Sequence, residues 1–154
     1  AMRAGEKLRQ HGLVAGRLTV FFHTNRHKPE RPQHGASRTS SLHPMTADSL
    51  ELVAVARRGV ERAWREGVAY TKAGVLLEEL VAADERPRTL FEDAEGRDRR
   101  QRLMGAIDEI NGRFGKFAAI PGVQGFRREW KQQASMKSPA WTTRIEEVPR
   151  VRAK

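Results

Sequence analysis

The sequence has no cysteine, which excludes a disulfide framework, a thiolate zinc site and a cysteine nucleophile. It lacks any apolar run near the roughly 20 residues that span a bilayer, and charges from Arg3 onward argue against a secretory signal. Acidic residues are few beside basic ones, 19 against 29, which gives a net charge of +10. We therefore expect a cytoplasmic protein with an anionic partner such as nucleic acid or an acidic membrane surface.

The positive charge is distributed unevenly along the chain. Residues 1–44 carry eight Lys and Arg against two acids and hold all five His, residues 45–85 carry five against eight, and residues 86–154 carry sixteen against nine. Two basic segments therefore flank an acidic one, which favours nucleic-acid binding over a basic surface that serves solubility alone.

Hydrophobic periodicity and turn residues predict five elements within residues 1–80. The strand at 17–24 directs Leu18, Val20 and Phe22 toward a core. A helix through Lys7 and Leu8 precedes this strand and ends at Gly12, and a second strand at 36–42 follows it after a loop at 25–35. A second helix starts at Thr46 and Asp48, runs through Leu50 to Trp64 and ends at Gly67. A third strand at 69–77 completes the five elements. This order predicts an α+β fold, a small antiparallel sheet with two helices on one face and a basic surface on the other.

The composition changes beyond residue 82. Charge, proline and a lack of periodicity at 83–98 predict a linker between a first domain at 1–82 and a small helical and irregular domain at 99–154. The last domain opens with a predicted helix at 99–114, closed by Gly115, whose apolar stripe comprises Leu103, Ile107, Ile110 and Phe114. A short strand at 117–120 follows in this interpretation, and Trp130 and Trp141 anchor an irregular tail.

The sequence contains no pattern typical of a catalytic centre. His23 and His27 are four residues apart, but that spacing runs from the end of a strand into a loop, so they are not expected to bind zinc. Asp108 and Glu109 are adjacent on a helix and diverge, whereas two-metal catalysis needs carboxylates that converge about 4 Å apart. We expect no catalytic residue, metal site or cofactor in this chain alone.

Basic residues at strand ends and in the adjoining loop are the better functional signal. A sheet presents such side chains along a phosphate backbone. The candidate DNA-binding residues are Arg17, Arg26, Lys28, Arg31, Arg38 and Lys72, with Thr24 at the end of the first strand.

Several motifs together resemble one protein family. Residues 4–9 (AGEKLR), 20–24 (VFFHT), 46–48 (TAD) and 70–75 (YTKAGV) are similar to the little-finger domain of UmuC-like Y-family translesion DNA polymerases. Residues 102–104 (RLM), 113–115 (RFG) and 138–144 (SPAWTTR) resemble the small C-terminal domain that follows it in UmuC proteins. The matches cover nearly the whole chain in the family's order.

This resemblance implies a DNA-gripping fragment of an error-prone polymerase that bypasses damaged DNA during the SOS response. In that family the little finger lays its sheet along the major groove of the primer-template and holds mostly phosphates. The palm, fingers and thumb have no counterpart in these residues, so the resemblance implies that the chain alone is not an enzyme. It implies DNA as the partner and no membrane.

Two differences from the family change what we expect. The family's little finger begins with a strand before its first helix, so we expect a sheet one strand short with a gap inside it, and therefore either marginal stability or a dimer that covers the gap. The family also binds the sliding clamp through a Gln-x-x-Leu-Phe peptide. Leu90 and Phe91 supply the apolar anchors of that peptide here, but Pro87 stands at the Gln position.

Two other functions remain open. The region after the little finger is thought to contact UmuD′ and RecA in UmuC proteins, and Trp130 and Trp141 are candidate anchors for such a protein-interaction module. An RNA-binding ribosomal-type protein would share the charge, but it does not predict the motifs at 70–75 and 138–144.

Overall fold

The computed structural model describes residues 1–87, 93–116, 118–122, 146 and 148. The chain divides into two compact units, Ala1–Pro121 and Gly122–Lys154, and the fold below is that of the first. Its elements in chain order are α1 (Met2–Gln10), β1 (Leu13–Thr24), β2 (Gly35–Thr46), α2 (Ser49–Glu61), β3 (Tyr70–Ala82) and α3 (Ala94–Phe114). The predicted order of helix, strand, strand, helix and strand is confirmed.

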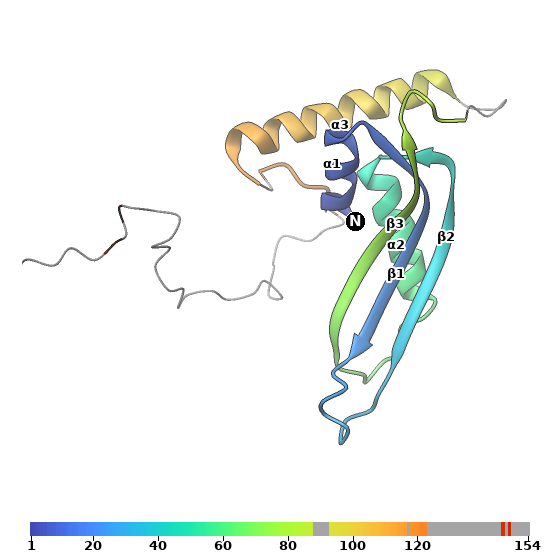
Figure 1. Cartoon of the computed structure of the whole chain (residues 1–154), viewed down its shortest axis with the longest axis vertical. Helices are drawn as coiled ribbons and strands as arrows, with labels where there is room; N and C mark the ends of the chain where they lie inside the picture. Colours follow the sequence, from blue (N-terminus) through green and yellow to red (C-terminus); the bar gives the residue numbers. More distant parts are fainter. Residues whose placement is uncertain (88–92, 117, 123–145, 147, 149–154) are drawn as a thin grey trace, which may run out of the picture. The chain divides into compact units, whose positions relative to one another are not determined.

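The three strands form one antiparallel sheet in the order β2-β1-β3 (Figure 1). Each strand extends beyond its predicted bounds, since β1 begins four residues before Arg17 and β3 continues to Ala82. The expected gap inside the sheet is wrong, because β1 is hydrogen-bonded to a neighbour on both sides. A further strand would pair with the outer edge of β2 or β3.

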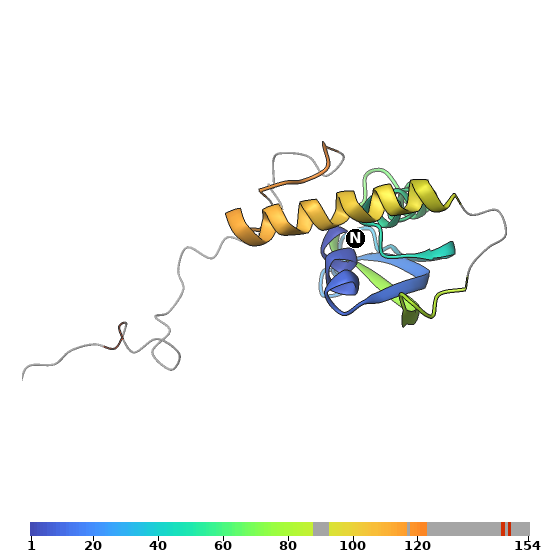
Figure 2. The same ribbon diagram turned by 90° about the horizontal axis from the view of Figure 1, so that it is seen from above.

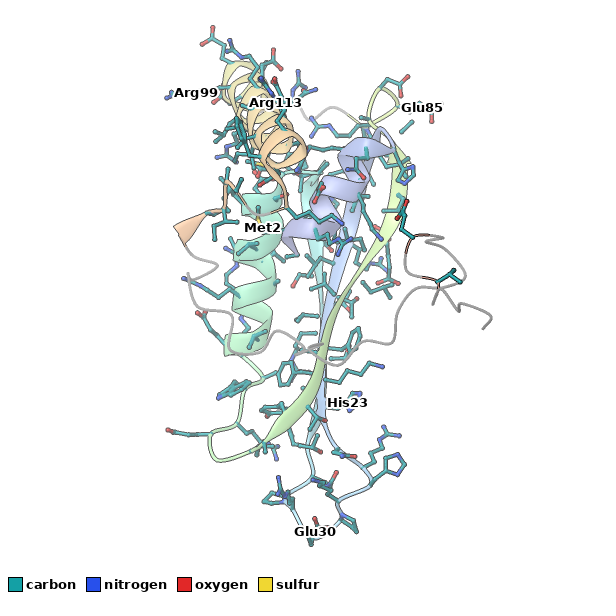
Figure 3. All side chains as sticks on the ribbon, turned by 90° about the vertical axis from the view of Figure 1, so that its left-hand side faces the viewer. Met2, His23, Glu30, Glu85, Arg99 and Arg113 are labelled. Atoms are coloured by element: carbon teal, nitrogen blue, oxygen red, sulfur yellow. The ribbon has the colours of Figure 1, made fainter. Side chains whose placement is uncertain are left out.

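The core lies between the sheet and the two helices α1 and α2. The predicted core residues Leu18, Val20 and Phe22 of β1 are all buried, together with Leu8 of α1 and Leu52 of α2. The side view in Figure 3 shows α2 lying along one face of the strands. The α+β class, with an antiparallel sheet and these two helices on one face, is confirmed.

Helix α2 begins where the sequence predicts but ends earlier. The Asp48 carboxylate accepts a hydrogen bond of 2.7 Å from the Leu50 N–H, which caps the first turn. The last helical residue is Glu61 rather than the residue before Gly67. The early end releases Trp64 from the helix, and its ring packs against Tyr70 at a centroid distance of 4.5 Å.

A glycine allows α2 to lie close against the central strand. A Cβ atom on Gly59 would lie 2.6 Å from Cγ1 of the buried Val20, a distance that carbon atoms do not tolerate. The side chain of Val20 therefore occupies the space that any larger residue at position 59 would need.

Helix α3 begins at Ala94, five residues before the predicted start and inside the predicted linker. The Asp93 side chain accepts a 3.0 Å hydrogen bond from the Gly96 N–H and so caps the helix. The buried residue of α3 is Met104, whereas Leu103, Ile110 and Phe114 of the predicted apolar stripe are exposed. Among the apolar residues of α3, burial is therefore concentrated at Met104.

Polar contacts attach α3 to the other two helices. The Arg9 guanidinium of α1 donates to both carboxylate oxygens of Asp108, at 2.6 and 2.7 Å. Its remaining donors reach the Ala47 carbonyl at 2.5 Å and the Ser49 hydroxyl at 2.9 Å. Figure 2, seen from above, shows α3 running past α1. We call these four hydrogen bonds the Arg9 clasp.

The chain turns back after α3 without forming the predicted strand. Gly115 closes the helix with a φ of 96°, as predicted, and the Asn111 side-chain amide donates to and accepts from the backbone of Ala119 at 3.0 and 2.9 Å. Residues 118–120 are therefore not in a strand, and Phe117 lies outside the described residues. Within the described part, every helix is too short or too polar to cross a membrane.

Candidate nucleic-acid interface

The sheet face opposite α1 and α2 carries mixed side chains, Leu76 beside Thr19 among them, and is not uniformly basic. Thr19 forms hydrogen bonds of 2.8 Å with the Thr39 hydroxyl and 2.9 Å with the Glu78 carboxylate, so an acid lies near the middle of this face. Phe21 lies over Gly74, where a Cβ atom would overlap the ring. The expectation of a basic surface over the whole face is therefore wrong, and the cations gather at one end.

Four of the predicted DNA-binding residues come together at that end. Arg26, Lys28 and Arg31 are exposed on the β1–β2 loop, and exposed Lys72 of β3 lies directly across from His23 at its base. Figure 3 shows this loop, which also carries Glu30, projecting at the end of the sheet away from Glu85. None of the four forms an ion pair with another described residue. We call Arg26, Lys28, Arg31 and Lys72 the basic tip.

The side chain of Gln33 holds the basic loop in shape. Its amide nitrogen donates to the carbonyls of Asn25, Lys28 and Arg31 at 3.3, 2.8 and 3.1 Å. Its oxygen accepts a 2.8 Å hydrogen bond from the Thr24 hydroxyl. Thr24 is itself buried, so this predicted DNA contact supports the loop from inside.

The other two predicted basic residues lie elsewhere. Arg17 forms an ion pair of 2.5 Å with Glu79, nearer the opposite end of β1. Arg38 is paired in register with Val20, so its side chain leaves the strand on the helix-covered side of the sheet, with its Cβ beside Gly59. The structure thus separates Arg17 and Arg38 from the basic tip.

The other candidate sites of the sequence add no further cluster. The clamp-type residues Leu90 and Phe91 and the candidate anchors Trp130 and Trp141 lie outside the described residues. His23 hydrogen-bonds the Thr24 carbonyl at 2.9 Å through Nδ1. Across the described ranges, no group of three or more His, Asp or Glu side chains is placed to hold a metal ion.

Sequence reasoning missed a second group of functional candidates beside the β2 edge. Residues 62–65 (RAWR) leave the end of α2 and line a groove with residues 34–38. The sequence places Trp64 within the predicted second helix, and that placement is wrong, because α2 ends at Glu61. An exposed tryptophan between two arginines was the available signal.

Two family models and several curated proteins match this chain. Residues 1–90 match the impB/mucB/samB family C-terminal domain, and residues 101–151 match a domain of unknown function, DUF4113. The chain is 31% identical to Protein UmuC of Salmonella typhimurium over 152 residues, 99% of this chain and 36% of that protein. It is 32% identical to Protein SamB of Salmonella typhimurium over 149 residues, 97% of this chain and 35% of that protein.

A further relative carries a polymerase name. DNA polymerase IV of Caulobacter vibrioides is 34% identical over 121 residues, which cover 78% of this chain and 28% of that protein. The chain spans about a third of the length of the curated relatives it matches. The match over residues 1–90 and the relatives aligned along nearly the whole chain show that it belongs to the impB/mucB/samB family as a UmuC-like Y-family C-terminal part.

Proposed function

We propose that this chain is the DNA-binding C-terminal part of an error-prone translesion DNA polymerase, acting in DNA repair and the SOS response in the cytoplasm. It grips the phosphates of the primer-template, including damaged DNA, and does no catalysis by itself. The relatives named UmuC and DNA polymerase IV support the polymerase context. The observation that carries the DNA contact is the basic tip.

The basic tip suits phosphate binding for electrostatic reasons. Its four cations lie at one end of the sheet and form no ion pair with other described residues, so their charge is available to an external anion. Lys and Arg that neutralise phosphates release counterions, which gives binding that depends on salt and little on base sequence. Arg17 and Arg38, the other two basic residues predicted to bind DNA, are proposed as separate phosphate contacts outside the basic tip, with Arg17 partly neutralised by Glu79.

The experiment compares the wild type with a variant in which Arg26, Lys28, Arg31 and Lys72 are all changed to Gln. Binding to a labelled primer-template is measured by fluorescence anisotropy at several salt concentrations. Since each lost phosphate contact lowers the slope of log affinity against log salt by about one, we expect a decrease of about three to four.

A matched control removes the same number of charges from the helices. Arg3, Arg58, Arg99 and Arg102 are exposed and lie on α1, α2 and α3, and their replacement by Gln should leave most of the slope intact. Equal losses in the two variants would mean that the net charge alone attracts DNA, and the basic tip would not be the binding surface.

A protein-interaction function is the second candidate. Exposed Leu103, Ile110 and Phe114 lie seven and four residues apart on α3, a spacing that places them on one helix face. Such a face suits a protein partner, and we propose UmuD′, RecA and the sliding clamp as partners. Leu90 and Phe91 remain the proposed anchors for the clamp, and Trp130 and Trp141 those for UmuD′ and RecA. Binding of any of these purified proteins that persists in Leu103→Glu/Ile110→Glu would show that this face is not involved.

A further inference from the structure

The groove beside the β2 edge combines an exposed aromatic ring with three arginines. It has a volume of about 400 Å³ and is lined by residues 34–38 at the start of β2 and residues 62–65 between α2 and β3. It lies along the edge of the sheet toward the helix-covered side, because Arg38 is in register with the core residue Val20. It is therefore a different surface from the open face of the sheet.

Trp64 is held in this groove by other rings. Its side chain is 53% exposed, while Tyr70 and Phe22 lie behind it at centroid distances of 4.5 and 6.0 Å. The Tyr70 hydroxyl is hydrogen-bonded to His34 Nδ1 at 2.7 Å and accepts from the Arg65 N–H at 3.2 Å. The ring is thus positioned before any ligand arrives, which lowers the entropic cost of binding.

The charges around Trp64 are strongly one-sided. Arg38, Arg62 and Arg65 line the groove, and none forms an ion pair within the described ranges. The two segments 25–38 and 62–72 together hold seven Lys and Arg against two Glu. The groove and the basic tip also share one end of the sheet, since residue 34, which lines the groove, is the last residue of the β1–β2 loop (Figure 1).

We propose that this groove binds single-stranded nucleic acid, with one base stacked on Trp64 and the neighbouring phosphates held by Arg38, Arg62 and Arg65. Stacking on a fixed aromatic ring together with a cationic path for the backbone is the general mode of single-strand binding. An acidic peptide would also use the charges, and the experiments below distinguish it from nucleic acid. The proposal goes beyond the duplex grip of the basic tip.

The first experiment observes Trp64 directly in the full chain. With Trp130→Phe and Trp141→Phe, Trp64 is the only tryptophan, and its fluorescence reports base stacking. We expect quenching on addition of a 12-nucleotide oligothymidylate and little quenching with a blunt duplex of equal charge. Equal quenching by both, or by neither, would overturn the proposal.

The second experiment separates stacking from charge. Trp64→Leu keeps apolar packing against Tyr70 and Phe22 but removes the π face, whereas Trp64→Phe keeps it. We expect Trp64→Leu to weaken oligothymidylate binding about 5-fold or more, Trp64→Phe to retain most of the affinity, and duplex affinity to stay unchanged in both. Changing Arg38, Arg62 and Arg65 to Gln should lower the single-strand salt slope by about two.

Three results would count against a single-strand site. Wild-type oligothymidylate affinity in Trp64→Leu, at an unchanged melting temperature, would exclude stacking. A 12-residue polyglutamate that binds the groove more tightly than oligothymidylate would assign it to an acidic peptide. If changing Arg38, Arg62 and Arg65 to Gln weakened duplex binding as much as the four-Gln variant of the basic tip does, the groove and the basic tip would form one binding site. If instead the four-Gln variant of the basic tip kept wild-type duplex binding, the duplex proposal would be wrong and the single-strand proposal for this groove would still stand.

Discussion

Arg9 offers the sharpest test of how α3 is held. Its side chain is 16% exposed and that of Asp108 28% exposed, and all four hydrogen bonds of the Arg9 clasp connect segments far apart in the sequence. The perturbation is a double-mutant cycle of Arg9→Ala and Asp108→Ala, which isolates the energy shared by the two side chains.

The magnitude follows from burial and from what each truncation leaves behind. Exposed ion pairs contribute about 0.2–1 kcal/mol, and breaking a buried pair costs about 3–5 kcal/mol. Since this pair is largely but not fully buried, we expect a coupling energy of about 1.5 kcal/mol. Arg9→Ala should cost about 2.5 kcal/mol because Ala47 and Ser49 also lose their donors, and Asp108→Ala about 1.5 kcal/mol, because Arg9 keeps those two partners.

The assay is urea denaturation followed by far-ultraviolet circular dichroism, at low and at high salt. Arg100 and Glu51 provide a matched control, because this ion pair also joins α3 to another helix, α2, but is more exposed, at 58% and 36%. Its coupling should stay below about 0.5 kcal/mol and vanish at high salt. A coupling for Arg9 and Asp108 as small as that of the control pair would refute the reasoning.

Two further predictions concern packing and catalysis. Gly59→Ala should destabilise the protein by about 1–2 kcal/mol because its Cβ would overlap Val20. Gly105→Ala on α3, with open space around it, should stabilise the protein by about 0.5–1 kcal/mol. Urea midpoints measure both changes, and destabilisation by both substitutions, or by neither, would contradict this account. The purified chain should not extend a primer on a template, since two-metal transfer needs converging carboxylates and the described residues hold no such cluster; extension that a substitution within the chain abolishes would overturn that expectation.

The sheet and its two covering helices could be predicted because their signals are local. Alternation of apolar residues marks Leu18, Val20 and Phe22 in β1, and Asp48 marks the start of α2 by its capping side chain. The attachment of α3 could not be predicted in this way. Arg9 and Asp108 are 99 residues apart, and no periodic pattern indicates a polar contact at that separation.

In the candidate interface, too, the parts with local sequence signals could be predicted and the parts that depend on distant pairing could not. Arg26, Lys28 and Arg31 could be identified because an exposed loop is evident from Pro, Gly and polar density alone. The groove around Trp64 depends on where α2 ends and on the pairing of β2 with β1, which places Arg38 on the helix side. Both are properties of the assembled sheet rather than of any short stretch.

The amide of Gln33 fixes the shape of the β1–β2 loop, on which three cationic side chains repel one another. It ties three backbone carbonyls together and so keeps three like charges on one short loop. A polyanion that binds these charges more tightly in their folded arrangement than in the unfolded chain links binding to folding. If the chain binds nucleic acid as proposed, we expect the nucleic acid to raise its melting temperature, because a ligand that prefers the folded state stabilises that state.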